Sequence, residues 1–261
     1  MLRTITATRY VTPLREGGSL PAIIEADDAG LYVLKFRGAG QGAKALIAEL
    51  ISGELARAAG LRVPEVVLVD LDPALGRNEP DSEIRELLKA SAGLNLALDY
   101  LPGSVTFDPV AGPFPDAAMA SAIVGFDAFI TNVDRTPKNP NMLSWHRDLW
   151  LIDHGASLYF HHSWEDWEAR SQGRFAPIKD HVLLPWASAL PEAEGLLRAR
   201  LTPQVVERTV AAIPESWLVG AESPFPTPDA HRAAYVTWLT RRVEALPAFL
   251  EEAARARAQL V

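Results

Sequence analysis

Residues 132–143 read NVDRTPKNPNML and carry the strongest indication of fold and function in the chain. Asp134 stands five positions before Asn139, and prolines restrict the backbone on both sides of that asparagine. A loop with this spacing can hold a carboxylate beside a substrate hydroxyl and an amide oxygen on a divalent cation, as phosphoryl transfer requires. Arg135 and Lys138 would then neutralise charge that develops on the transferred group. A polar turn between two apolar segments would explain these residues about equally well.

A second acidic residue follows the loop after an apolar run, in WLIDHG at residues 150–155. Asp153 stands 19 positions after Asp134, which leaves room for a short hairpin that brings the two carboxylates together. The strands of this hairpin are expected near residues 141–143 and 149–153. Two carboxylates at low dielectric repel each other unless a divalent cation lies between them. The pair therefore predicts a metal site.

Two charged residues lie upstream in segments that are otherwise apolar. Lys35 belongs to the β-type run LYVLKF, where an unpaired buried ammonium would be costly. A helix is expected over residues 44–59, with apolar residues at helical spacing and Gly60 as its C-terminal cap. Glu49 lies on this helix beside the apolar face and can pair with Lys35, and Glu54 is the second candidate. The alternative is that the lysine extends to the surface and the glutamate is solvated.

Two glycine-rich segments are candidates for binding phosphate. REGGSLP, residues 15–21, can offer backbone N–H groups of Gly17, Gly18 and Ser19 to a nucleotide, although a plain hairpin turn is an equal alternative. FRGAGQGAKAL follows a strand and resembles a dinucleotide-binding turn, but Ala43 stands where the third glycine is required. We interpret this second segment as a flexible connection between a strand and a helix.

The pattern of apolar residues changes from strand-like to helical near residue 102, where a proline-rich connector begins. We therefore predict an α+β fold of two lobes with a crevice between them: a β-rich lobe over residues 1–102 and a mostly helical lobe over residues 103–261. The charged segment 78–86 is expected to form a loop in solvent. The other expected elements are strands at 20–26, 31–36, 63–71 and 94–101 and a helix at 116–131.

Composition and charge exclude several classes of function. The 261 residues include no cysteine, so disulfides, thiolate metal sites and cysteine nucleophiles are excluded. The formal net charge of −8 argues against a broad surface for nucleic acid or anionic membrane. The beginning of the sequence lacks the pattern of a signal peptide, and no apolar run approaches the ~18 residues that a membrane span needs. We therefore expect a cytoplasmic protein that binds neither nucleic acid nor membrane.

Three phrases together resemble one family of enzymes. They are DRTPKN at 134–139, IDHG at 152–155, and AELISGELARAAGLRVPE at 48–65. All three are similar to motifs of the HipA-like kinases and, more distantly, of the phosphatidylinositol kinases. The resemblance covers roughly residues 15–185. It implies a bilobal protein-kinase-like fold, ATP with Mg²⁺, and phosphorylation of a serine or threonine of a protein substrate.

The resemblance also implies a part for each candidate residue. Lys35 would bind the phosphates with Glu49 as its partner, Asp134 would be the catalytic base, and Asn139 and Asp153 would hold magnesium. An antitoxin or another regulatory protein is a possible partner under the same resemblance. Adenine would bind the backbone of a hinge formed by Asp99, Tyr100 and Leu101.

Other polar residues are expected to support this site. Asp127, on the preceding helix, is placed to hydrogen-bond the catalytic loop, and Asn141 is expected to point away from the metal and hold the loop. Packing or contact with substrate is expected for His161 and His162, because no further ligands for a metal stand at suitable spacing. Two alternative functions remain: a kinase of small molecules or lipids, and a catalytically silent nucleotide-binding regulator. The intact set of charged residues argues against the silent regulator.

Overall fold

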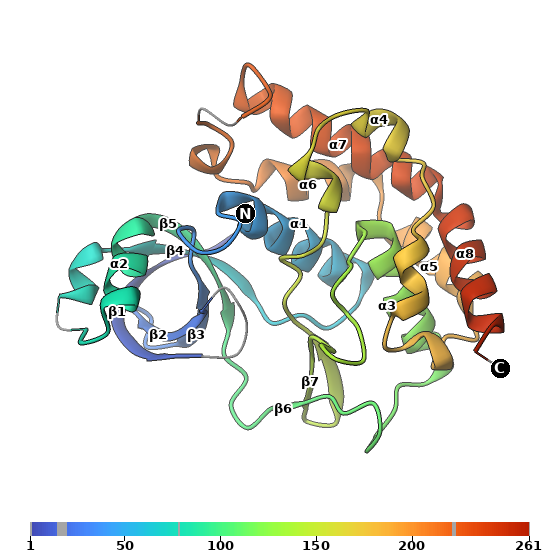
Figure 1. Cartoon of the computed structure of the whole chain (residues 1–261), viewed down its shortest axis with the longest axis horizontal. Helices are drawn as coiled ribbons and strands as arrows, with labels where there is room; N and C mark the ends of the chain where they lie inside the picture. Colours follow the sequence, from blue (N-terminus) through green and yellow to red (C-terminus); the bar gives the residue numbers. More distant parts are fainter. Residues whose placement is uncertain (1, 15–19, 78, 221–222, 261) are drawn as a thin grey trace.

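The computed structural model describes residues 2–14, 20–77, 79–220 and 223–260. Figure 1 shows a barrel of strands on one side and a group of helices on the other, with helix α1 (Ala43–Ala59) lying between them. This is the predicted α+β fold of two lobes. The predicted boundary at residue 102 stays a prediction, and the last strand of the barrel ends at Asp99. Within the described ranges no helix is long and apolar enough to cross a bilayer.

The strands of the first lobe form a closed barrel in the order β1-β2-β3-β5-β4. Alternate residues point inward, so Ile24 and Leu34 are fully buried inside the barrel. Lys35 is the next residue along its strand and therefore faces outward, toward α1. The strands are β1 (Thr4–Pro13), β2 (Ala22–Ala26), β3 (Leu31–Lys35), β4 (Val66–Leu71) and β5 (Gly93–Asp99).

Sequence patterns located four of these strands but missed β1. Buried and exposed residues alternate only over the first half of β1, so the sequence pattern of a strand is weak there. β1 also pairs in parallel with β4, which is distant in the sequence. The expected loop at 78–86 was also wrong in part, because helix α2 (Ser82–Ala90) begins inside it. The side chain of Asp81 accepts a hydrogen bond from the amide of Glu83 and caps this helix.

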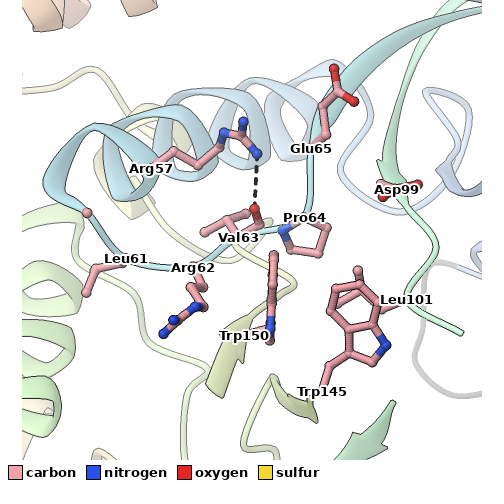
Figure 2. Close-up of a pocket in the computed structure, with 11 residues that line it drawn as sticks. Arg57, Leu61, Arg62, Val63, Pro64, Glu65, Asp99, Leu101, Trp145 and Trp150 are labelled. Carbon is pink, nitrogen blue, oxygen red and sulfur yellow. Dashed lines mark hydrogen bonds between the residues drawn. The ribbon is translucent and has the colours of Figure 1, made fainter. Parts of the chain in front are cut away.

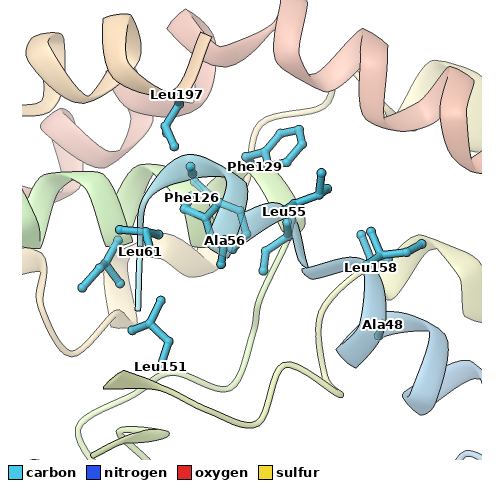
Figure 3. Close-up of a cluster of buried hydrophobic side chains, with 14 of the residues drawn as sticks. Ala48, Leu55, Ala56, Leu61, Phe126, Phe129, Leu151, Leu158 and Leu197 are labelled. Atoms are coloured by element: carbon cyan, nitrogen blue, oxygen red, sulfur yellow. The ribbon is translucent and has the colours of Figure 1, made fainter. Parts of the chain in front are cut away.

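Helix α1 matches the predicted helix at 44–59 within one residue. Gly60 has φ 88° and ends it in the left-handed conformation, which a glycine adopts without strain. Buried residues occur on all sides of α1, because the helix packs against the barrel on one side and against the second lobe on the other. Figure 3 shows the second contact, where Leu55 and Ala56 of α1 lie beside Phe126 and Phe129. One apolar core therefore joins α1 to the second lobe.

The second lobe is built around helix α3 (Ala117–Ile130), which packs against α5 (Leu190–Arg200) and α8 (Leu246–Ala258). The side chain of Asp116 caps α3 by accepting a hydrogen bond from the amide of Met119. The small sheet of this lobe contains β6 (Val105–Thr106), β7 (Met142–Trp145) and β8 (Asp148–Leu151). The lobe also contains α4 (Trp167–Arg170), α6 (Pro203–Ala211) and α7 (Pro228–Glu244).

Candidate active site

Lys35 binds two carboxylates that come from different parts of the chain. Its Nζ donates to Oε2 of Glu49 on α1 and, over 2.5 Å, to Oδ1 of Asp153 just after β8. Burial by itself would lower the pKa of Lys35, but the two carboxylates outweigh it and raise this pKa above its ordinary value. Burial likewise opposes ionisation of Glu49, and the nearby ammonium nevertheless holds its pKa well below its usual range. The three side chains therefore form a charged cluster.

The expected choice between two glutamates is clear in the structure. The side chain of Glu49 is fully buried and faces Lys35, whereas Glu54 pairs with Arg57 over 3.4 Å. A contact that the sequence did not indicate also holds Glu49. Nδ1 of His154 lies 3.4 Å from its Oε1, and this histidine is fully buried. His154 directly follows Asp153, so it links the metal-binding candidate to α1.

The loop after α3 brings the predicted base and asparagine together. Oδ2 of Asp134 accepts a hydrogen bond from Nδ2 of Asn139 over 2.8 Å and a second from Nδ2 of Asn141 over 3.2 Å. The amide of Asp134 donates to Oδ1 of Asn132 over 3.1 Å, which fixes the turn. Asn141 therefore holds the loop, as expected, although it does so by pointing toward Asp134 and not elsewhere.

Arg135 was expected to face a transferred phosphoryl group, and that expectation was wrong. Its side chain is 1% exposed and its Nε donates to Oδ2 of Asp127 over 2.5 Å. Nη1 of the same side chain donates to the carbonyl oxygens of Asn141 and Ile152. A buried guanidinium requires such partners, because an unpaired charge is costly in the protein interior. Lys138 remains exposed and, within the described ranges, has no carboxylate partner.

Asp127 anchors this loop from α3, as the sequence predicted. Its Oδ1 accepts from Nδ2 of Asn132 over 3.1 Å, and its Oδ2 accepts from Arg135 and from Nε2 of His181 at 2.9 Å. Burial would raise the pKa of Asp127, but Arg135 and His181 outweigh it and hold this pKa well below its usual range. Burial lowers the pKa of His181. The sequence did not indicate that His181 takes part in these contacts.

Arg135 also brings the two acidic candidates to the same place. The amide of Ile152 donates to the carbonyl oxygen of Asn141 over 3.0 Å, and Arg135 donates to both carbonyl groups. Asn141 binds Asp134 through its side chain, and Ile152 directly precedes Asp153. The catalytic loop and the end of β8 therefore lie against each other. Asp153 has φ 55°, and its side chain is 48% exposed, so it is accessible to solvent.

The oxygen atoms at this site fit magnesium together with phosphate. Asn139 donates through its nitrogen to Asp134, which leaves its amide oxygen free to accept a cation, and Asp153 has a second carboxylate oxygen. Across the described residues, no group of three or more His, Cys, Asp or Glu side chains is arranged to hold a metal. A kinase-type Mg²⁺ takes only one or two protein ligands and completes its coordination with phosphate and water. The donor set is consistent with such an ion.

The expected adenine-binding hinge contains a backbone donor for a base. The amide of Asp99 donates to the carbonyl oxygen of Glu65 over 2.9 Å, and the amide of Tyr100 donates to the carbonyl oxygen of Leu31 over 3.0 Å. The amide of Leu101 has no such backbone partner in the part of the chain that the structure describes. The use of this amide by adenine stays a prediction.

The remaining candidates are the glycine-rich segment before β2 and the histidines of the second lobe. Gly17, Gly18 and Ser19 lie outside the described residues. His161 packs in the second lobe, with Nδ1 3.0 Å from the hydroxyl of Tyr235, and burial lowers its pKa well below the ordinary value.

The fold is similar to that of known kinases. A family model described as HipA-like kinase matches residues 8–245. A Helicobacter pylori proinflammatory kinase, CtkA, superposes with a TM-score of 0.59 at 13% sequence identity, over 100% of this chain and 99% of that one. The Golgi casein kinase with Mn and ADP bound superposes with a TM-score of 0.52 at 12% identity, over 96% of this chain and 73% of that one. The comparison with curated proteins found no match. The family model covers most of the sequence, and the chain therefore belongs to the HipA-like kinase family.

Proposed function

We propose that this kinase uses ATP and Mg²⁺ to phosphorylate a serine or threonine of a protein. The observation that carries the proposal is the charged cluster of Lys35, Glu49 and Asp153, held beside the loop of Asp134 and Asn139 by contacts of Arg135. Membership of a kinase family supports use of a nucleotide. The similarity to the Golgi casein kinase, whose name includes a protein substrate, supports a protein acceptor.

The residues have distinct parts in the proposed transfer. Lys35 binds phosphate oxygens, and Glu49 keeps its ammonium in position. Asp134 accepts the proton of the substrate hydroxyl as its oxygen bonds to the γ-phosphorus, and the bond to the bridging β–γ oxygen breaks to release ADP. Magnesium bound by Asn139 and Asp153 would neutralise charge on the phosphates. The hydrogen bonds from Asn139 and Asn141 orient the carboxylate of Asp134.

Transfer of label from [γ-³²P]ATP tests the proposal. The protein is incubated with labelled ATP, Mg²⁺ and a cell extract, and label is measured in protein, lipid and small-molecule fractions. Label on protein phosphoserine or phosphothreonine is expected. The Asp134→Asn variant should lose this transfer, and Asp180→Asn, a change in an exposed acid outside the cluster, should retain it. Label confined to lipid or metabolite would favour the alternative kinases, and nucleotide binding without any turnover would favour a silent regulator.

A further inference from the structure

A cavity lies beside the expected adenine hinge and shares Asp99 and Leu101 with it, but contains none of the residues assigned to the chemical step of phosphoryl transfer. It has a volume of 440 Å³ and is formed by three segments: the connection from α1 to β4, the chain around Asp99 and Leu101, and the β7–β8 hairpin. Neither Lys35, Glu49, Asp134 nor Asp153 lines it. Its size falls within the range of pockets that bind small molecules or single side chains.

Hydrogen bonds fix the three walls of this cavity relative to one another. The amide of Leu151 in β8 donates to the carbonyl of Arg62 over 2.8 Å, and the amide of Asp99 donates to that of Glu65 over 2.9 Å. Nε1 of Trp145 donates to the carbonyl oxygen of Pro102 over 2.9 Å. The cavity therefore exists before a ligand enters, and little conformational entropy is lost on binding.

Two indole rings form one side of the cavity. The ring centroids of Trp145 and Trp150 are 5.3 Å apart at 74°, so the edge of one ring meets the face of the other. Figure 2 shows both rings below Pro64, with Leu101 close to Trp145. Both tryptophans are only partly buried, which leaves aromatic surface open to a ligand. Indole faces attract cations, most strongly where water is excluded.

The charges around the cavity also favour a cation. Arg57 donates to the carbonyl of Val63 and pairs with Glu54, and Arg62 pairs with Asp148 over 3.1 Å. Both arginines are therefore already engaged. In Figure 2, Arg62 lies on the opposite side of Trp150 from Leu101 and Asp99.

The carboxylate of Asp99, by contrast, has no hydrogen bond or ion pair among the described residues. Burial, and then the nearby carboxylate of Glu65, raise the pKa of Asp99, whereas Arg3, which pairs with Glu65 over 3.1 Å, lowers it. A cation bound at Asp99 would favour the ionised carboxylate, whereas an anion would be repelled by it.

We propose that this cavity is a binding site for an organic cation with a short apolar stem, either an alkylammonium or a guanidinium group. The stem would lie against the indoles and Leu101, and the charged group would reach Asp99. A free small molecule and a lysine or arginine side chain of another protein share this chemistry. The site depends on no step of phosphoryl transfer, so cation binding is measured without nucleotide.

Isothermal titration of the full chain with butylguanidinium chloride tests the site, and butylurea serves as the uncharged probe of similar shape. We expect butylguanidinium to bind at least about tenfold more tightly than butylurea. Asp99→Asn should weaken butylguanidinium binding by about the same factor. Asp70→Asn changes an exposed acid at the other end of the barrel sheet and should leave this affinity unchanged. Trp150→Leu should weaken binding further, with folding checked by circular dichroism.

The source of the cation is distinguished with the peptide Ac-Ala-Arg-Ala-NH₂. Binding at least tenfold tighter than that of butylguanidinium would indicate a protein side chain, and equal affinity would indicate a free small molecule; either result supports the site. Equal binding of butylurea, equal losses in Asp99→Asn and Asp70→Asn, or tighter binding of butyl phosphate would overturn the proposal. Undetectable binding of butylguanidinium to the wild-type chain would overturn it too.

Discussion

Removal of the buried charge of Asp127 is the sharpest test of how the catalytic loop is held. Asp127→Asn keeps the shape of the side chain but leaves the guanidinium of Arg135 without its anionic partner in a site where both side chains are fully buried. Breaking a buried ion pair from one side typically costs about 3–5 kcal/mol of unfolding free energy. Asp127 also accepts from Asn132 and His181, so we expect a loss at the upper end of this range.

Equilibrium unfolding in urea at pH 7, followed by tryptophan fluorescence, measures this loss. Asp180→Asn is the matched control, because its carboxylate pairs with Lys179 at the surface, where such pairs contribute little. The double variant Asp127→Leu with Arg135→Met removes both charges and should recover much of the stability that the single variant loses. The reasoning would be refuted if Asp127→Asn lost less than about 1 kcal/mol, or if the double variant were less stable than the single one.

The remaining predictions concern the nucleotide, the metal and pH. Lys35→Met should lower kcat/KM for ATP by about 10²–10³, because the lysine is the proposed cation on the phosphates. Initial-rate kinetics measure this change. Asn139→Ala should raise the Mg²⁺ concentration required for half-maximal rate by about tenfold, because it removes one proposed ligand. His161 and His181 have pKa values below the ordinary 6.5 in the folded chain, so the unfolded chain binds more protons below about pH 6.5. The free energy of unfolding is therefore highest above about pH 6.5 and falls as pH decreases. Urea unfolding between pH 7.5 and 5 should show this fall, and the fall should be smaller in His161→Gln.

Each of these predictions has a control and a contradicting result. Lys138→Met removes an exposed lysine on the same loop as Asp134 and should affect ATP kinetics less than Lys35→Met; an equal effect would contradict the assignment. An unchanged Mg²⁺ requirement in Asn139→Ala would argue against that residue as a ligand. For the histidines, His146→Gln is the exposed control. Stability that rises as pH falls from 7 to 5.5 would contradict the lowered pKa values of His161 and His181.

Local patterns in the sequence were sufficient for the residues that carry charge in apolar surroundings. Lys35 stands at the end of an apolar strand and Glu49 on the buried face of a helix, so each required a partner, and the structure pairs them. The bounds of α1 and α3 followed from helical spacing and from caps at Gly60 and Asp116. The spacing of Asp134 and Asn139 on one short loop also limited how far apart their side chains could lie.

The directions of side chains in turns required the tertiary structure. Whether Arg135 points to solvent or inward depends on Asp127 and His181, the latter lying 46 residues further along the chain. His154 contacts Glu49 only because α1 packs beside the end of β8. These contacts join segments far apart in sequence, and no local periodicity reports them.

The sequence by itself determined which residues must find partners, because an isolated charge is too costly to bury and apolar spacing defines the buried face of each element. It also determined the helices and strands that present those residues. Only the tertiary structure decided which partners they find, because closing the barrel between β1 and β4 and packing α1 between the lobes bring distant segments together. Those long-range contacts place Lys35, Glu49 and Asp153 in one cluster and turn Arg135 inward to hold the loop of Asp134.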